Sequence, residues 1–437
     1  MKLEKYKRDI IHALTEIIIM IISVSVVIMV SHYYDGENTA GTGQDSTGQT
    51  ENNETEIPLP EKKEINVWYN DINYEQYFKI LAAEYEKESG TAVNVRFVSD
   101  MEYLENINKA NREDGSIEYE KPDVYLLNTE DLEAAYGYGL AKVNTDSVLN
   151  EENFTVNSLK CVTYKGKYVA YPLAYDTSFM LYNSKYSAEA PISFDELIRV
   201  SDEFDYTTNS NVKRVLYFNV SDTMHNYCFL GAYLNFGGTY GDDKSIIDIE
   251  NERVKKAASY YTELSKAAGI DIRDSELNKI PEKFVNEEIL YTIVTMREFN
   301  EIKRLSVDKE LDYRACVIPG MNDELDTKSL SVTQSLVINY MSDKEDMSAD
   351  FIRYAVLKRD DLIYDNTGLM PARQVKDTDR FYDVIQNQYE NSANLPKLMI
   401  SADYYVLIGE LLNQAWQGEN IDDILHRISE NYIKRAD

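Results

Sequence analysis

An isolated carboxylate in a short β-rich segment is the most distinctive chemical group in this chain. Asp176 lies in the segment GKYVAYPLAYDTSFMLYN, residues 166–183, between an apolar run that ends at Pro172 and a second run that starts at Phe179. Because proline has no N–H to give to a strand ladder, Pro172 predicts the end of the first strand. A strand that stops, exposes an acid and restarts predicts a crossing between two lobes. The Asp176 carboxylate would then point into the gap between them.

Other polar groups follow predicted strands, at positions where the loops of an α/β sheet face a cleft. They are Asn70 and Asp71 after the strand Ile65–Tyr69, and Asn128, Thr129 and Glu130 after the strand Asp123–Leu127. Amide and carboxylate groups at such positions can bind the hydroxyls of a ligand. The same residue types also cap helices, so capping and ligand contact both remain interpretations of these side chains.

The elements that position these groups follow from hydrophobic periodicity. The strand Ile65–Tyr69, a helix over residues 74–85 closed by Gly90, and the strand Val93–Val98 form a βαβ unit, which predicts a parallel strand pair. Strands and helices continue to alternate towards the C-terminus, and no internal repeat is present. The pattern predicts an α/β protein.

Several segments, taken in order, resemble the bacterial extracellular solute-binding proteins of the maltose-binding type, the ligand-capturing subunits of ABC importers. Residues 166–183 are similar to the hinge crossing of that family, and further similar segments extend from Ile65 to the C-terminus. They are INVWYND (65–71), PDVYLLNTEDLEAAYGYGLA (122–141), SFDEL (193–197), FVNEEILYTIVT (284–295), VIPG (317–320), TGLMPAR (367–373) and the helical run 421–433. The resemblance implies a two-lobed periplasmic-binding-protein-like fold of type II, with the ligand cleft between the lobes.

The resemblance also places Asp176 and residues of the second lobe in the cleft. Asp222 in FNVSDTMH and Tyr404-Tyr405 in SADYYVL fall in segments similar to cleft walls of the family. Three rings are expected to stack on sugar C–H groups while polar side chains bind hydroxyls. They belong to Tyr69, Tyr175 and Tyr404.

Arg297 departs from the family pattern. In TIVTMREF it stands where sugar-binding relatives commonly offer an aromatic ring. An arginine there either binds an acidic sugar or pairs with one of the many carboxylates of the chain. The missing ring argues against a neutral maltodextrin-like ligand.

The composition excludes several functions. With 76 acidic and 45 basic residues the net charge is −31, which repels nucleic acid and favours a monomer. The sequence has no HExxH, GxSxG, P-loop or GxGxxG motif, so we expect no catalytic residues, metal site or cofactor. Cys161, Cys228 and Cys316 lack CxxC or metal-ligand spacing. They are interpreted as small buried residues, with pairing of two of them as the alternative.

The N-terminal region predicts a membrane tether. Basic residues at positions 2, 5, 7 and 8 precede the apolar run Ile10–Val30, whose length at about 1.5 Å per residue spans roughly 30 Å. No small-x-small cleavage site and no lipid-accepting cysteine follows. This favours an uncleaved anchor over a removed signal peptide, with the basic residues in the cytoplasm. The composition of residues 35–64 predicts a disordered extracellular linker.

These observations give one domain scheme and one preferred function. The scheme is a cytoplasmic segment 1–9, a transmembrane signal-anchor 10–34, the linker 35–64, lobe 1 at 65–174 and 318–374, and lobe 2 at 175–317 and 375–437. We expect a single-pass protein of a Gram-positive bacterium, with its C-terminal domain extracellular, that captures a carbohydrate for the permease subunits of an ABC importer. The alternative is a ligand sensor or interaction protein on the same fold, partnered with a membrane signalling protein, which an uncleaved anchor would suit.

Overall fold

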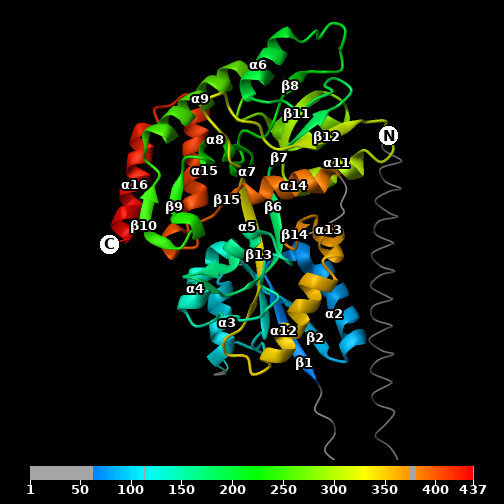
Figure 1. Cartoon of the computed structure of the whole chain (residues 1–437), viewed down its shortest axis with the longest axis vertical. Helices are drawn as coiled ribbons and strands as arrows, with labels where there is room; N and C mark the ends of the chain where they lie inside the picture. Colours follow the sequence, from blue (N-terminus) through cyan, green and yellow to red (C-terminus); the bar gives the residue numbers. More distant parts are fainter. Residues whose placement is uncertain (1–62, 100, 113–114, 116, 375–379, 437) are drawn as a thin grey trace, which may run out of the picture. The chain divides into compact units, whose positions relative to one another are not determined.

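The computed structural model describes residues 63–99, 101–112, 115, 117–374 and 380–436 (Figure 1). Lys62–Asp437 forms one compact unit, whose described residues contain two large sheets and two small two-stranded ones. The predicted basic N-terminus, anchor and linker lie outside the described residues. Among the helices that are described, none combines the length and the apolar character needed to cross a membrane.

The first sheet contains the predicted βαβ unit. Within the described residues it has seven strands in the order β14-β6-β13-β3-β1-β2, with β15 beside β13. β1 runs parallel to β2 and β3, which confirms the predicted parallel pair, while β13 is antiparallel to β3 and β6. The strands are β1 (Glu64–Tyr69), β2 (Ala92–Phe97), β3 (Val124–Asn128), β6 (Tyr171–Thr177), β13 (Leu330–Ile338), β14 (Met370–Pro371) and β15 (Ala393–Asn394).

Helices flank this sheet because their apolar residues recur on one face. α2 buries Tyr77, Phe78 and Leu81, and ends at Gly90, whose φ of 73° is left-handed as a helix-ending glycine requires. The helical elements of this half are η1 (Ile72–Tyr74), α2 (Glu75–Ser89), α3 (Tyr103–Arg112), η2 (Thr129–Asp131), α4 (Leu132–Gly137), α5 (Val156–Val162), α12 (Glu345–Arg353), the π-helical η5 (Tyr354–Lys358) and α13 (Asp361–Thr367). A small ribbon joins β4 (Thr163–Tyr164) to β5 (Lys167–Tyr168).

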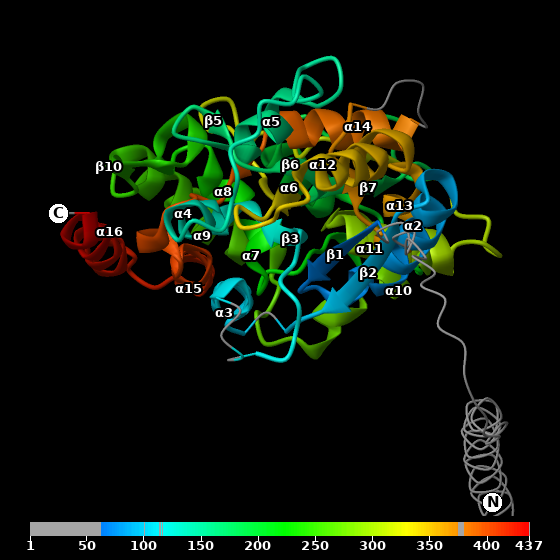
Figure 2. The same cartoon turned by 90° about the horizontal axis from the view of Figure 1, so that it is seen from below.

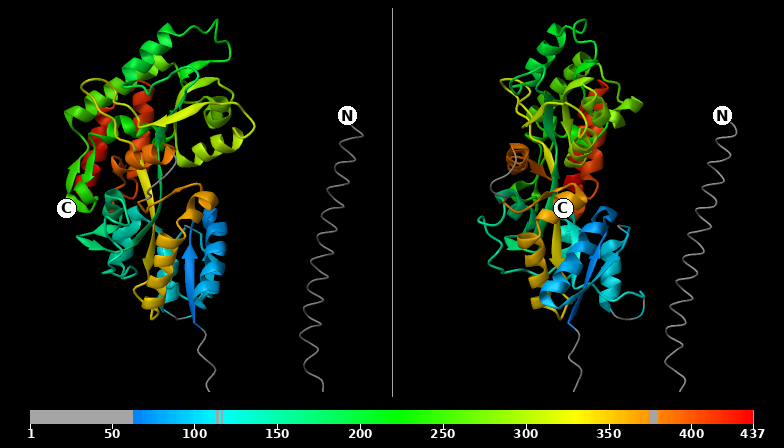
Figure 3. Two further views of the ribbon diagram at one scale, coloured as in Figure 1. Left: turned by 45° about the vertical axis from the view of Figure 1, so that its right-hand side comes forward. Right: turned by 90° about the vertical axis from the view of Figure 1, so that its right-hand side faces the viewer.

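The second sheet has the order β12-β7-β11-β8 among the described residues. Its strands are β7 (Phe179–Asn183), β8 (Arg214–Leu216), β11 (Ile289–Val294) and β12 (Tyr313–Cys316), and a separate hairpin pairs β9 (Asn235–Gly237) with β10 (Asp243–Asp248). The accompanying helical elements are α6 (Phe194–Glu203), α7 (Thr223–Asn226), α8 (Cys228–Gly231), η3 (Gly238–Tyr240), α9 (Glu252–Ala268), η4 (Ser275–Lys279), α10 (Ile280–Val285), α11 (Met296–Leu305), α14 (Arg380–Glu390), η6 (Met399–Ser401), α15 (Tyr404–Trp416) and α16 (Asp422–Ala436). In Figure 3 the blue strands of the first sheet lie at the lower end of the described region and the green α6 lies at the upper end.

Adjacent strands carry the chain between the two sheets. β6 of the first sheet is separated from β7 of the second by Ser178 alone, and β12 returns the chain to β13. After α14, the segment 391–403 passes β15 and leads into α15. The positions where the chain changes sheet therefore lie close to Asp176.

Pro172 does not end a strand, contrary to the prediction. β6 runs through it, and the ladder between β6 and β13 shifts register between the pairs Gln334–Ala174 and Ser335–Pro172. Because the shift leaves Leu173 without an opposite residue, this bulge accommodates a residue that cannot donate a ladder hydrogen bond. Asp176 consequently lies inside β6, opposite Val332, and not in a loop between two strands.

The core is continuous through both halves and rich in aromatic side chains. The three cysteines are free and buried within it, which confirms their interpretation as small buried residues. Tyrosine accounts for much of this packing. The ring of Tyr175 on β6, for example, stacks on Tyr389 of α14 with centroids 3.7 Å apart.

Candidate functional site

Asp71 and Arg297 join the two halves of the molecule. Asp71 follows β1 in the first sheet, and Arg297 lies in the first turn of α11, directly after β11 of the second. Arg297 Nη2 donates to Asp71 Oδ2 at 3.1 Å. Asp71 also caps η1 by accepting a hydrogen bond from the Asn73 N–H, which confirms the capping interpretation of this residue.

Asp176 contacts the same helix terminus as Arg297. Its Oδ1 accepts a hydrogen bond from the backbone N–H of Met296 at 2.9 Å, at the start of α11. Burial raises the pKa of Asp176 to about 6, against the lowering effects of the Met296 N–H and the Arg297 charge. This carboxylate is therefore held at the junction of the sheets, at an energetic cost when it is ionised.

Tyr74 is a member of this group that the sequence did not identify. Its hydroxyl donates to Gln334 Oε1 at 2.5 Å, and its ring is fully buried. Burial raises its pKa, and the nearby Asp71 and Asp176 carboxylates add to that effect. In the sequence Tyr74 was only one of several regularly spaced apolar residues of a helix, a pattern that carries no information about the contacts of its hydroxyl.

A second network contains Asp222 and a buried histidine. Asp222 caps α7 by accepting from the Met224 N–H, and its Oδ2 lies 3.2 Å from His225 Nδ1. His225 Nε2 lies 2.7 Å from Glu298 Oε2. Burial alone would lower the pKa of His225, but Glu298 and Asp222 raise it to about 10, so the imidazole is protonated at neutral pH.

Glu298 links this network to the first turn of α11. It forms a capping box with Thr295, accepting from the Thr295 N–H while Thr295 Oγ1 accepts from the Glu298 N–H. The T-x-x-E spacing, residues 295–298, is a capping signal that could have been found in the sequence. His225 carried no such local signal, because its two acids come from α7 and α11.

Tyr405 completes the network at the surface. Its hydroxyl donates to Asp222 Oδ1 at 3.3 Å, and its ring is half-buried. Tyr405 also lines a cavity of about 290 Å³ together with Glu130 and Tyr404. Glu130 follows β3 of the first sheet, so this cavity brings predicted residues of both halves together, with the exposed ring of Tyr138 beside them.

The three rings expected to stack on sugar are packed inside the protein. Tyr69, Tyr175 and Tyr404 are 3%, 1% and 2% exposed. Their faces are occupied by protein aromatic rings, since Tyr69 stacks on Phe78, Tyr175 stacks on Tyr389, and Tyr404 meets Phe236 edge-on. The expectation of three open sugar platforms is therefore wrong for this conformation, and the partly exposed aromatic side chains at the site are Tyr405 and Tyr138.

The two asparagines lie at neighbouring strand ends. Asn70 directly follows β1, and Asn128 is the last residue of β3, which runs parallel beside β1. Both are half-buried. Although Asn128 stands at the N-cap of η2, its side chain makes no capping hydrogen bond. The carboxyl ends of these parallel strands thus present amides on the side of the sheet where Asp71 meets Arg297.

The sequence and fold identify the family. A family model described as bacterial extracellular solute-binding protein matches residues 81–387. This match covers well over half of the chain, which therefore belongs to the bacterial extracellular solute-binding proteins, as the sequence resemblance indicated.

Curated relatives lie in the same family. The chain is 29% identical over 187 residues to the maltotriose-binding protein of Pyrococcus abyssi, a match that covers 41% of this chain and only 38% of that protein. It is 21% identical over 362 residues to the maltooligosaccharide ABC transporter solute-binding lipoprotein of Streptococcus pneumoniae, covering 77% and 80% of the two chains.

Solved structures share the two-lobed fold. An extracellular solute-binding protein from Staphylococcus aureus in complex with maltose superposes with a TM-score of 0.71 at 17% identity, covering 86% of this chain and 98% of that one. The maltose-binding periplasmic protein of Listeria monocytogenes, also with maltose, gives 0.67 at 18% identity with the same coverage. At these identities the similarity establishes the two-lobed α/β fold and nothing further.

Proposed function

We propose that this protein captures a carbohydrate between its two lobes and delivers it to the permease subunits of an ABC importer. The names of the relatives favour the maltooligosaccharide class, against the expectation from the missing ring at Arg297. The observation that carries the proposal is the convergence of acids, amides, Arg297 and Tyr405 from both sheets on one inter-lobe face. Carboxylates accept hydrogen bonds from hydroxyl groups, amides both accept and donate them, and half-buried tyrosine rings can cover sugar C–H faces. The second support is that similar proteins are a maltotriose-binding protein and a maltooligosaccharide ABC transporter solute-binding lipoprotein.

The residues on this inter-lobe face have the following proposed roles. Asp71, Asp176, Asp222 and Glu130 accept from sugar hydroxyls, Asn70, Asn128 and Arg297 donate to sugar oxygens, and Tyr405 stacks. Tyr69, Tyr175 and Tyr404 hold the walls in place by packing. The Asp71–Arg297 pair occupies part of this surface in the ligand-free chain, so a sugar that binds there would replace the contact with its own hydroxyls.

The N-terminal segment supplies the membrane attachment. Residues 10–34 form an uncleaved signal-anchor and residues 35–64 a linker that carries the lobes outside the cell. This arrangement would keep the binding protein near its permease without the lipid that commonly anchors Gram-positive relatives. The protein is neither an enzyme nor dependent on a cofactor in this proposal.

Titration calorimetry of the full-length protein with maltose and maltotriose tests the function. Saturable binding is expected, with a decrease in the radius of gyration by X-ray scattering as the lobes close. Asp222→Asn should weaken binding roughly tenfold, whereas Asp271→Asn, which changes an exposed acid away from the inter-lobe face, should not. Absence of binding by every neutral oligosaccharide tested would contradict the proposal and favour a sensor that recognises another ligand.

A further inference from the structure

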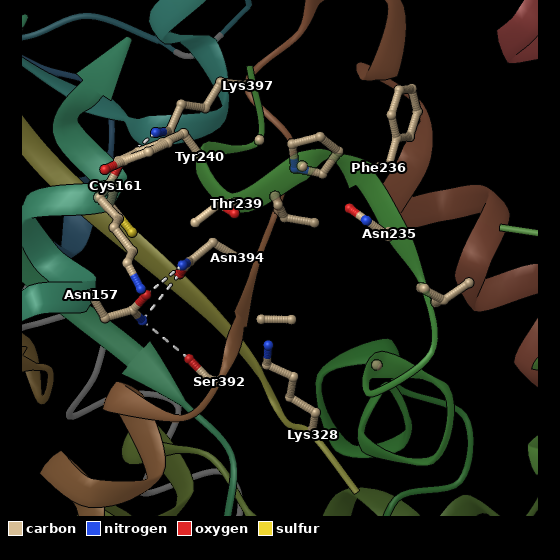
Figure 4. Close-up of a pocket in the computed structure, with 18 of the residues that line it drawn as sticks. Asn157, Cys161, Asn235, Phe236, Thr239, Tyr240, Lys328, Ser392, Asn394 and Lys397 are labelled. Atoms are coloured by element: carbon tan, nitrogen blue, oxygen red, sulfur yellow. Dashed lines mark hydrogen bonds between the residues drawn. The ribbon is translucent and has the colours of Figure 1, made fainter. Parts of the chain in front are cut away.

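A second cavity lies apart from the predicted ligand residues. It has a volume of about 580 Å³ and is enclosed by α5, the turn from β9 through η3, and the segment Glu390–Lys397 (Figure 4). Of the predicted ligand residues, only Tyr404 lines it. In Figure 2, α5 and α14 lie above β6 whereas α7 and α11 lie below it, and α5 and α14 contribute Lys160 and Glu390 to the lining of this cavity.

The charge of this cavity is opposite to that of the chain. Three lysines line it, Lys160, Lys328 and Lys397, together with a single acid, Glu390. The chain as a whole has 76 acidic and only 45 basic residues, so lysines without a carboxylate partner are unexpected. Yet none of the three lysines forms an ion pair with any residue that the structure describes.

The single acid of the lining, Glu390, forms no ion pair with these lysines in the described part of the chain. Glu390 Oε2 accepts a hydrogen bond from the backbone N–H of Asn157 at 3.2 Å. The ammonium group of Lys397 is held by two neutral acceptors, the carbonyl oxygens of Lys160 and Thr163, at 2.5 and 2.6 Å. Three lysines therefore line a solvent-sized space, and none of them is ion-paired with a carboxylate of the described residues, although the charge of Asp242 acts on Lys397.

The charge of Lys160 acts on Lys328. Burial lowers the pKa of Lys328, and the charge of Lys160 lowers it further. Burial also lowers the pKa of Lys397, to about 8. In Figure 4 the ammonium group of Lys328 points into the cavity, and the side chain of Asn235 enters from the opposite wall. Bringing like charges together in a half-buried space is unfavourable unless an anion joins them.

We propose that this cavity is a binding site for a small molecule that carries an oxyanion, either a carboxylate or a phosphate group. The ammonium groups of Lys160 and Lys328 bind the oxyanion, and Lys397 adds its charge from the wall. The amide of Asn235 and the hydroxyl of Thr239 supply further donors, and the exposed ring of Tyr240 borders the remaining space. The proposal does not depend on the sugar site, since none of the three lysines lines the cavity that holds Glu130 and Tyr405.

The test uses the full-length protein with inorganic phosphate and with citrate as separate probes, in calorimetric titrations at constant ionic strength set with sodium chloride. Saturable binding of at least one probe is expected, and the preferred probe distinguishes phosphate from carboxylate recognition. The double substitution Lys160→Gln/Lys328→Gln should weaken that binding at least tenfold, because each lysine supplies a charge-assisted hydrogen bond. The matched control, Lys213→Gln/Lys266→Gln, removes the same charge from two exposed lysines and should leave the affinity unchanged.

Thermal melting distinguishes a variant that loses anion binding because it unfolds from one that loses only the two lysine charges. Neither Lys160 nor Lys328 has an ion-pair partner among the described residues, so the double variant should melt at or above the wild-type temperature without anion. Lys328→Glu provides a second variant, which should abolish binding because its carboxylate occupies the place of the ligand and pairs with Lys160. The proposal fails if neither probe binds saturably to the wild type. It also fails if either pocket variant binds as tightly as the control.

Discussion

Arg297 Nη2 and Asp71 Oδ2 lie 3.1 Å apart and connect the first turn of α11 to the end of β1, across 226 residues of sequence. In the structure Arg297 pairs with a carboxylate, which is one of the two interpretations of this arginine from the sequence. Because the two residues belong to different halves, the contact reports on lobe arrangement as well as on ligand binding.

A double-mutant cycle on this pair should show weak coupling in stability and a strong effect on binding. The Arg297 side chain is 49% exposed and that of Asp71 22%, so solvent screens the pair and its coupling in unfolding free energy should be at most about 1 kcal/mol. Arg297→Gln and Asp71→Asn should each weaken sugar binding roughly tenfold, because each removes a charged hydrogen-bonding partner. Denaturant unfolding and calorimetry measure the two quantities. A coupling of several kcal/mol with unchanged affinity would make the pair purely structural.

Two adjacent tyrosines should separate packing from ligand contact. Tyr404→Ala removes a buried ring and should lower the free energy of unfolding by about 3–5 kcal/mol. Tyr405→Ala removes a half-buried ring that reaches Asp222, and should cost little stability but weaken sugar binding tenfold or more. Thermal melting and titration of both variants provide the comparison. Equal effects of the two changes on stability would show that Tyr405 also belongs to the core.

We expect Asp176 to strengthen sugar binding and to lower the free energy of unfolding. A folded-state pKa near 6, above the unfolded value of about 4, means that its contribution to stability is present below pH 4 and is lost as pH rises through 6. Asp176→Asn keeps an acceptor for the Met296 N–H and should raise the free energy of unfolding at pH 7 by roughly 2 kcal/mol. The gain should shrink between pH 6 and pH 4 in denaturant unfolding. The same variant should bind sugar more weakly, and a loss of stability at pH 7 would refute this interpretation.

Local patterns predicted the elements of the fold, whereas the contacts at the site depend on distant segments. The βαβ unit ending at Gly90 follows from periodicity within one stretch of chain, and the structure reproduces it. The strand end predicted at Pro172 is wrong because a register shift against β13, more than 150 residues later in the sequence, lets the strand continue. The family resemblance predicted Tyr404 and Tyr405 in a cleft wall but could not say which ring faces the core, since that depends on the rotation of α15 against Phe236.

The membrane attachment is a separate prediction on residues 1–34. The run Ile10–Val30 is long enough to span a bilayer, and no cleavage or lipidation site follows it. Mass spectrometry of the membrane fraction should therefore recover peptides from the first 34 residues. A mature N-terminus between Ser31 and Ala40 would mean that the segment is a removed signal peptide. Truncation to Lys62 should release the protein from membranes and leave its melting temperature unchanged, because residues 35–64 have little apolar surface to pack.

The buried His225 should give the protein a distinctive alkaline pH dependence. Its pKa of about 10 lies above the unfolded value near 6.5, so its contribution to stability is complete below pH 6.5 and is lost as pH rises through 10. His225→Gln leaves Asp222 and Glu298 without their shared cation and should lower the free energy of unfolding by about 3 kcal/mol at pH 6. The difference from wild type should narrow steadily towards pH 10 in denaturant unfolding. His426→Gln is the matched control, since His426 is exposed and its removal should change stability by no more than about 0.5 kcal/mol. A difference for His225→Gln that stays constant from pH 6 to pH 10 would show that the imidazole is neutral and acts only through packing.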